Sequence, residues 1–228
     1  MSPARQPSYA PGAETERRSV SARAIRATGA VTAILALAAA GPAFGQDAAE
    51  RPAVVVPSDA DQLGAAVLAA PVDQREGATV LGWNPDGTVR VLREGTNELM
   101  CLADDPRDEE FSVACYHRSL EPYMARGREL TLEGVQGLER NKRRWEEAEA
   151  GLLELPKQPA TLHVLHGSGY DAAAGAVLDP YLRWSIYIPG ATPESTGLDT
   201  RPAPGAPWLM DPGTPGAHIM IVPPQPDG

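Results

Sequence analysis

The stretch Thr79-Val80-Leu81-Gly82-Trp83-Asn84-Pro85-Asp86-Gly87-Thr88-Val89-Arg90-Val91-Leu92 decides the fold. Two β-prone runs, residues 79–83 and 88–92, flank the turn-forming residues 84–87. Proline suits the second position of a turn, and glycine readily adopts the positive φ that tight turns require. The stretch therefore predicts an antiparallel β-hairpin, and it is the strongest hairpin signal in the chain.

Three helices are predicted around this hairpin. Ser58, followed by two aspartates, is typical of a helix start, and the short amphipathic helix that it begins is expected to end at Pro71. A second helix is expected from Ser119. The longest covers residues 133–155, where apolar residues recur every three or four positions and opposite charges four residues apart occupy a solvated face.

Further strands are predicted at residues 161–166, 182–188 and 218–222, which are rich in Ile, Val, Leu and Tyr. Residues 189–217 form a long connection with closely spaced prolines and glycines, and only residues 208–210 within it are typical of a short strand. Connections of this length are uncommon in compact domains unless they are functional or disordered.

This arrangement favours an α+β fold, a mostly antiparallel sheet with two or three helices on one side. The alternative is an all-β core with one helical insertion. We expect residues 1–45 to be a signal peptide, residues 46–78 an N-terminal segment with the short helix, and residues 79–222 a single globular domain. Residues 223–228 should form a frayed tail.

The first 45 residues have the three regions of a signal peptide. Arg17, Arg18, Arg23 and Arg26 precede the small and apolar run 30–40, and small residues follow at Ala43 and Gly45. The run has 11 residues, whereas a membrane-spanning helix needs about 20. No cysteine follows it to carry a lipid. We therefore expect cleavage near Gly45 and a periplasmic or extracellular product without a membrane anchor, exported by either the general or the twin-arginine route.

The charge of the expected mature chain is strongly negative. The whole chain has a net charge of −10, but residues 1–45 hold five arginines and two glutamates, so the remainder holds 15 basic and 28 acidic residues and carries −13. Nucleic-acid binding depends on lysine and arginine side chains that replace counterions along the phosphates. The sequence therefore predicts no nucleic-acid partner.

Cys101 and Cys115 are the two cysteines of the chain. In an exported protein, two cysteines that flank a polar stretch favour a disulfide over a metal pair. The rival interpretation pairs Cys115 with His117 as nucleophile and base.

Histidine spacing gives little support to a metal site. The four histidines are His117, His163, His166 and His218, and no two have the four-residue spacing of a zinc-binding helix. His163 and His166, three apart on a predicted strand, should point to opposite faces. We expect no metal and no cofactor. The remaining catalytic hypothesis uses His218 or His166 as base or metal ligand, with Asp211 or Glu194 as partner.

The end of the long connection is the best candidate for ligand binding. Trp208, Asp211, Thr214 and His218 stand there among rigid prolines, which lower the entropy lost when a loop becomes ordered. The competing interpretation is that Trp208 packs into the core while Asp211 only begins a turn.

Three stretches carry a resemblance to a known group. They are Leu92-Arg93-Glu94-Gly95-Thr96-Asn97 leading to Cys101, Cys115-Tyr116-His117-Arg118-Ser119-Leu120-Glu121-Pro122, and Pro207-Trp208-Leu209-Met210 continuing to His218-Ile219-Met220-Ile221. Together they resemble a family of uncharacterised exported bacterial proteins. The resemblance covers about residues 79–222 and implies a shared fold and export. It implies no activity, cofactor or site residue.

These observations favour a non-enzymatic, extracytoplasmic domain that binds a small ligand or an envelope partner through the surface near Trp208 and His218. A secreted hydrolase built on His218 or His166 is the first alternative. A purely structural envelope protein is the second.

Overall fold

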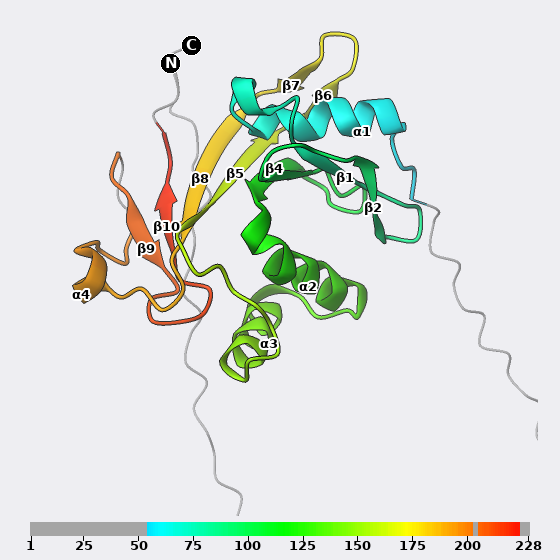
Figure 1. Ribbon diagram of the computed structural model, residues 1–228. Coiled ribbons are helices and arrows are strands. Elements are labelled where there is room, and N and C mark those ends of the chain that lie inside the picture. Colours follow the sequence, from blue (N-terminus) through cyan, green and yellow to red (C-terminus); the bar gives the residue numbers. More distant parts are fainter. Residues whose placement is uncertain (1–53, 203–204, 224–228) are drawn as a thin grey trace, which may run out of the picture. The chain divides into compact units, whose positions relative to one another are not determined.

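The computed structural model describes residues 54–202 and 205–223. The expected signal peptide, and most of the expected tail, lie outside the described residues. Among these residues, four α-helices accompany an eight-stranded, mostly antiparallel sheet, which confirms the α+β class (Figure 1). The α-helices are α1 (Asp59–Ala66), α2 (Glu121–Leu132), α3 (Gly137–Glu149) and α4 (Pro193–Thr196).

The sheet has the strand order β2-β1-β3-β4-β5-β8-β10-β9, and β6 and β7 form a separate two-stranded ribbon. Only β1 and β3 pair in parallel, and every other neighbouring pair in the large sheet is antiparallel. The strands are β1 (Thr79–Trp83), β2 (Val89–Arg93), β3 (Leu99–Leu102), β4 (Phe111–His117), β5 (Ala160–Gly167), β6 (Gly169–Asp171), β7 (Ala176–Leu178), β8 (Tyr181–Tyr187), β9 (Trp208–Met210) and β10 (His218–Ile221).

The predicted hairpin is confirmed. β1 and β2 pair antiparallel from Trp83 and Val89 outward, and Gly87 in the turn has a φ of 83°. The predicted start of α1 is confirmed as well, because the Ser58 side chain accepts a hydrogen bond from the backbone N–H of Asp61. Local residue chemistry therefore determines both features.

The helices lie on both faces of the sheet rather than on one side (Figure 1). The reason is visible in β4, where Cys115 and Tyr116 are adjacent, point to opposite faces and are both buried. Cys115 belongs to the core that Ala66 of α1 helps to form, whereas Tyr116 packs with Met124 of α2. Helix α1 thus shares a core with the sheet. The expected boundary between residues 46–78 and the domain 79–222 therefore separates residues that pack together.

The expected long helix over residues 133–155 is wrong at both ends. Gly134 and Gly151 have φ values of 85° and 72°, and each closes a helix with a Schellman motif. After α2, the N–H of Val135 bonds to the carbonyl of Leu130, and after α3 the N–H of Leu152 bonds to the carbonyl of Glu147. Only residues 137–149 therefore form α3, and α2 precedes it as a separate helix.

The three predicted strands at residues 161–166, 182–188 and 218–222 correspond to β5, β8 and β10, and the short strand at residues 208–210 is β9. The connection between β8 and β10 folds back on itself. Backbone N–H groups of Ile188 and Gly190 bond to the carbonyls of Ala217 and Thr214. These bonds place the turn after β9 directly beside the end of β8.

The predicted disulfide is confirmed. Cys101 on β3 and Cys115 on β4 are directly opposite in the antiparallel register, with 4.0 Å between their Cα atoms. Both are completely buried. Because Cys115 is in the disulfide, it has no free thiol. This excludes the hypothesis that Cys115 and His117 act as nucleophile and base.

Replacing both cysteines by alanine should lower the free energy of unfolding by about 3 kcal/mol, because the bridge closes a loop of about 15 residues in the unfolded chain. Urea unfolding of the wild type and the double variant measures the difference. A reducing agent should destabilise the wild type and leave the double variant unchanged. Equal stabilities of the two proteins under oxidising conditions would contradict the structural role of the bridge.

Candidate ligand-binding cleft

A cleft of about 450 Å³ lies between the sheet and the helices α2 and α3. Its volume is within the range of small-molecule sites. Its floor is apolar and comes from three adjacent strands, with Leu102 on β3, Ala114 on β4, and Leu162 and Val164 on β5. Met124 of α2 adds to the apolar wall. The cleft therefore has a mostly apolar floor, and helices α2 and α3 form its wall.

Four arginines line the cleft, and two of them have carboxylate partners. Arg107 pairs with Asp105 and lies 4.8 Å above the ring of Trp83. Arg128 donates to Glu121 at 2.6 Å and to the Tyr116 hydroxyl at 3.2 Å. These two guanidinium groups are therefore part of the structure of the cleft wall.

Arg144 is buried without a carboxylate partner. The residue is only 8% exposed, and among the described residues no carboxylate oxygen lies within 4.0 Å of its guanidinium. It donates to the carbonyl of Tyr123 at 3.2 Å and to the Asn141 side chain at 2.7 Å, and it lies 4.0 Å above the Tyr123 ring. Its Nε–H has no acceptor within the part of the chain that the structure describes, and burial lowers the pKa of Arg144.

Arg140 lies one helical turn before Arg144 and is partly buried. One of its terminal nitrogens donates to the Thr131 hydroxyl at 3.2 Å, but its buried Nε–H has no acceptor among the described residues. The charge of Arg140 acts on Asp108, whose pKa burial raises. The two guanidinium groups thus bring positive charge to one wall of the cleft.

A column of aromatic rings connects Arg144 with the region expected to bind a ligand. The Tyr123 ring meets the Tyr187 ring edge-on at 5.9 Å, and Tyr187 stacks on His218 at 4.7 Å. The Tyr123 hydroxyl also accepts a hydrogen bond from Trp145 at 3.1 Å. His218 and Arg144 are therefore the two ends of one packed column.

His218 is buried and its protonation is determined locally. Its Nδ1 lies 2.7 Å from the carbonyl of Gly216, so Nδ1 carries the proton, and burial lowers the pKa of His218. Asp211 is close enough to His218 and Arg144 for their charges to oppose the effect of burial, which still raises the pKa of Asp211. The ring is therefore neutral at pH 7, beside a partly buried carboxyl group.

The other residues predicted for this site have different roles. Trp208 is partly buried on β9 and lies on the same sheet face as His218, because Met220 and Met210 are their respective cross-strand partners. The Thr214 hydroxyl donates to the carbonyl of Asp211 at 2.8 Å and stabilises the turn. Glu194 is exposed at the start of α4, where hydrogen bonds from its own backbone N–H and from the Thr192 side chain lower its pKa. The structure thus groups Asp211 and His218, and Thr214 holds the turn between them.

His166 lies apart from this group. It shares the sheet face of His218, but its partner on β8 is Tyr181, whereas the partner of His218 is Tyr187. Six residues of strand correspond to about 20 Å. His163 points to the opposite face, as its spacing predicts. His166 therefore does not meet Asp211 or His218, and the catalytic hypothesis is reduced to the pair Asp211 and His218.

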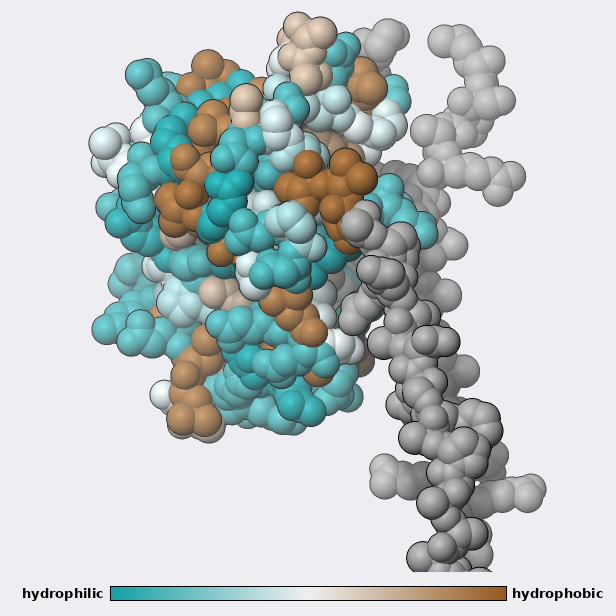
Figure 2. Space-filling view, turned by 90° about the vertical axis from the view of Figure 1, so that its right-hand side faces the viewer, coloured by the Kyte–Doolittle hydropathy of each residue, from teal (hydrophilic) through white to brown (hydrophobic). Residues whose placement is uncertain are grey.

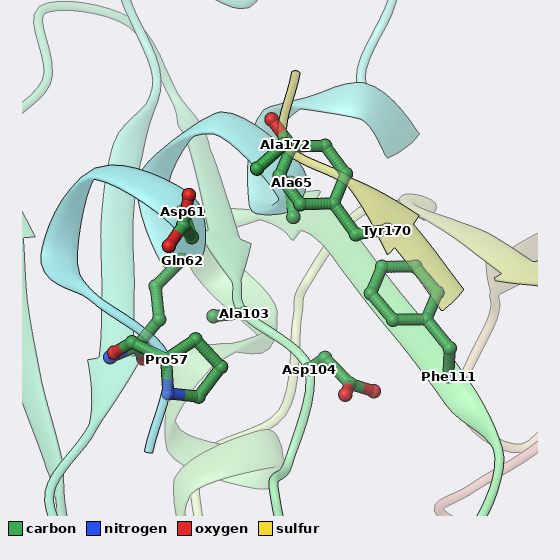
Figure 3. A pocket seen from close by; sticks show the side chains of 9 residues that line it. All are labelled: Pro57, Asp61, Gln62, Ala65, Ala103, Asp104, Phe111, Tyr170 and Ala172. Carbon is green, nitrogen blue, oxygen red and sulfur yellow. The ribbon is translucent and has the colours of Figure 1, made fainter. Parts of the chain in front are cut away.

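A second, smaller pocket of about 260 Å³ lies on the α1 side of the sheet. Figure 3 shows Phe111 and Tyr170 on one side of it and Pro57 and Gln62 on the other, with Asp104 near the opening. Gln62 accepts a hydrogen bond from the N–H of Trp83 at 2.7 Å, so its role is structural. Burial raises the pKa of Asp104 to about 6, although its carboxylate accepts the N–H of Ser112 at 2.7 Å.

The arginines of the cleft were missed because the charged residues of α3 were interpreted as a solvated helix face. Leu138 and Leu152, expected on the buried stripe, are in fact 60% and 81% exposed. The signal that could have found the cleft is the spacing of Arg140, Arg144 and Ala148. They stand four residues apart beside Trp145, on the stripe that faces the sheet.

Comparisons with protein-family models, with curated proteins and with solved structures find no match for this chain. The family resemblance drawn from the sequence therefore stays a prediction. Over residues 54–202 and 205–223, no helix is both long and apolar enough to span a membrane. In the same residues, no group of three or more His, Cys, Asp or Glu side chains is arranged to hold a metal ion.

The raised pKa of Asp104 makes stability depend on pH. A carboxyl group whose pKa is higher in the folded state stabilises the protein fully below its unfolded value of 3.8, and this contribution disappears as the pH rises through about 6. Asp104→Asn should therefore be more stable than the wild type at pH 7, by about 1 kcal/mol after allowance for solvent screening, with the advantage vanishing near pH 4.

Urea unfolding at several pH values measures this difference, and Asp73→Asn on an exposed turn is the matched control. A difference between Asp104→Asn and the wild type that does not change with pH would show that Asp104 is not buried as described.

Proposed function

We propose that the chain is an exported, non-enzymatic binding domain that holds a small ligand in the cleft between α2, α3 and the sheet. The observation that carries the proposal is the combination of a mostly apolar floor with the two guanidinium groups of Arg140 and Arg144, which form no ion pair among the described residues. Sites for small molecules typically combine apolar walls with a few polar groups that fix orientation.

Export is supported by two independent features of the chain. The first 45 residues have the composition of a signal peptide, and the buried Cys101–Cys115 bridge is typical of proteins that fold in an oxidising compartment. In this proposal the cleaved product lies in the periplasm or outside the cell.

Trp208, Asp211 and His218 do not line the cleft, and the packed rings of Tyr123 and Tyr187 lie between this region and Arg144. A hydrolase built on Asp211 and His218 is less well supported, because His218 is buried and donates its Nδ1 proton to the backbone. A purely structural role leaves the unpaired arginines without an explanation.

Ala114→Phe tests the proposal, because Ala114 lies on the cleft floor between Leu102 and Val164. The protein is purified after expression of the full chain in a bacterium, and native mass spectrometry measures bound small molecules. We expect a ligand on the wild type and at least a tenfold lower occupancy in Ala114→Phe. Ala174→Phe, at an exposed turn position, is the control and should keep the ligand.

A folded Ala114→Phe protein with the occupancy of the wild type would contradict the placement of the site. Turnover of an ester or peptide substrate that disappears in His218→Gln would favour the hydrolase instead.

A further inference from the structure

Two arginines of the cleft lack a paired carboxylate among the described residues, although Asp108 and Asp211 lie close enough for their charges to act on them. Arg140 and Arg144 form no ion pair within the described residues, whereas Arg107 and Arg128 beside them are both paired. A guanidinium stays protonated in proteins, so burial cannot be relieved by loss of the proton. Burying a charge is costly unless it is paired and hydrogen-bonded. A negatively charged ligand that pairs with these guanidinium groups would offset this cost.

The charge is local rather than a property of the whole surface. The mature chain carries an excess of acidic residues, yet the sheet face toward α2 and α3 also holds Arg183, whose buried Nε–H has no acceptor among the described residues. Of the two aspartates that line the cleft, Asp105 is engaged by Arg107, and Asp108 lies beyond 4.0 Å from Arg140. Arg140 and Arg144 on α3 are therefore not paired with a carboxylate within the described part of the cleft.

The rest of the cleft determines what kind of anion it fits. Its floor is mostly apolar, because Leu102, Ala114, Leu162 and Val164 offer no hydrogen bonds from their side chains, and Ser112 and Tyr116 of β4 are its polar residues. A free inorganic ion would leave this floor uncovered. A ligand with an apolar body would bury it and reach the guanidinium groups with one end.

We propose that the ligand is an amphiphilic anion, with an apolar body on the strand floor and a terminal carboxylate or phosphate held by Arg140 and Arg144. This inference rests on the proposed binding function. The planar guanidinium suits both oxyanions, since it donates parallel hydrogen bonds to two oxygens. Arg144 is held in place by Tyr123 and Asn141, so the group is positioned before the ligand arrives.

Isothermal titration calorimetry tests the inference with three probes of one chain length, octanoate, octyl phosphate and 1-octanol, each below its aggregation concentration. The wild type should bind octanoate or octyl phosphate at least tenfold more tightly than 1-octanol. Binding of octanoate alone identifies a carboxylate site, and binding of octyl phosphate alone identifies a phosphate site. This comparison needs no variant, so it does not depend on whether a substituted protein folds.

Substitutions then assign the charge to its residues. Arg144→Met and Arg140→Met should each weaken anion binding at least tenfold and leave 1-octanol binding unchanged. Arg143→Met is the matched control, because Arg143 lies on the exposed side of the same helix and pairs with Glu139 at 3.5 Å. It should bind the anions as the wild type does. Circular dichroism verifies the fold of each variant.

The outcomes separate this inference from the function on which it rests. If 1-octanol binds as tightly as the two anions and Ala114→Phe weakens all three, the cleft binds apolar ligands and the anion inference is overturned. If none of the probes binds, or if folded Arg140→Met and Arg144→Met proteins both keep full anion affinity, the inference is also overturned. The proposed function is then tested separately, by comparing the amount of bound small molecule in the wild type and in Ala114→Phe.

Discussion

The burial of β4 on both faces is the constraint on which the rest of the structure depends. Cys115 and Tyr116 are consecutive, 0% and 1% exposed, and point in opposite directions. The sheet must therefore be covered twice. On one face the bridge to Cys101 and the alanines of α1 close the core. On the other face the Tyr116 hydroxyl donates to Glu121, and Glu121 in turn holds Arg128, so the start of α2 is held against the strand.

This second layer is incomplete, and the gap is the cleft. α2 and α3 contact each other and the far end of the sheet, with Gly216 close against Tyr123 and Trp145. Over β3, β4 and β5 the helices leave space, and they direct Arg140 and Arg144 toward it. Placing an unpaired guanidinium in such a position costs several kcal/mol, which a purely structural helix would avoid with an apolar side chain.

On the face shown in Figure 2, apolar and polar residues are interspersed.

Local features were predictable from the sequence, and long-range ones were not. The hairpin around Gly87, the cap at Ser58 and the disulfide each follow from residues close together in the chain or from two cysteines alone. β3 and β4 were not recognised as strands, because their burial depends on partners as distant as β5. The single long helix was predicted because its periodicity continues through Gly134 and Gly151, whose positive φ values end α2 and α3.

The same distinction applies to the site. Asp211 and His218 are seven residues apart and joined by one turn, so their grouping could be predicted from the prolines and glycines around them. Arg144 could not be assigned a role, because an arginine on a charged helix is ordinarily solvated and only the packing of α3 on Tyr123 buries it. Its place in the cleft depends on strands that lie both before and after it in the chain.

The most direct test of this account follows the guanidinium groups themselves. Proton–nitrogen NMR spectra that resolve the arginine Nε–H groups can be recorded with and without octanoate or octyl phosphate, and assigned with the Arg140→Met, Arg143→Met and Arg144→Met variants. The account predicts that the Arg140 and Arg144 signals shift on binding and saturate with the calorimetric affinity, while the Arg143 signal does not move. Bound anion with unchanged Arg140 and Arg144 signals would contradict it.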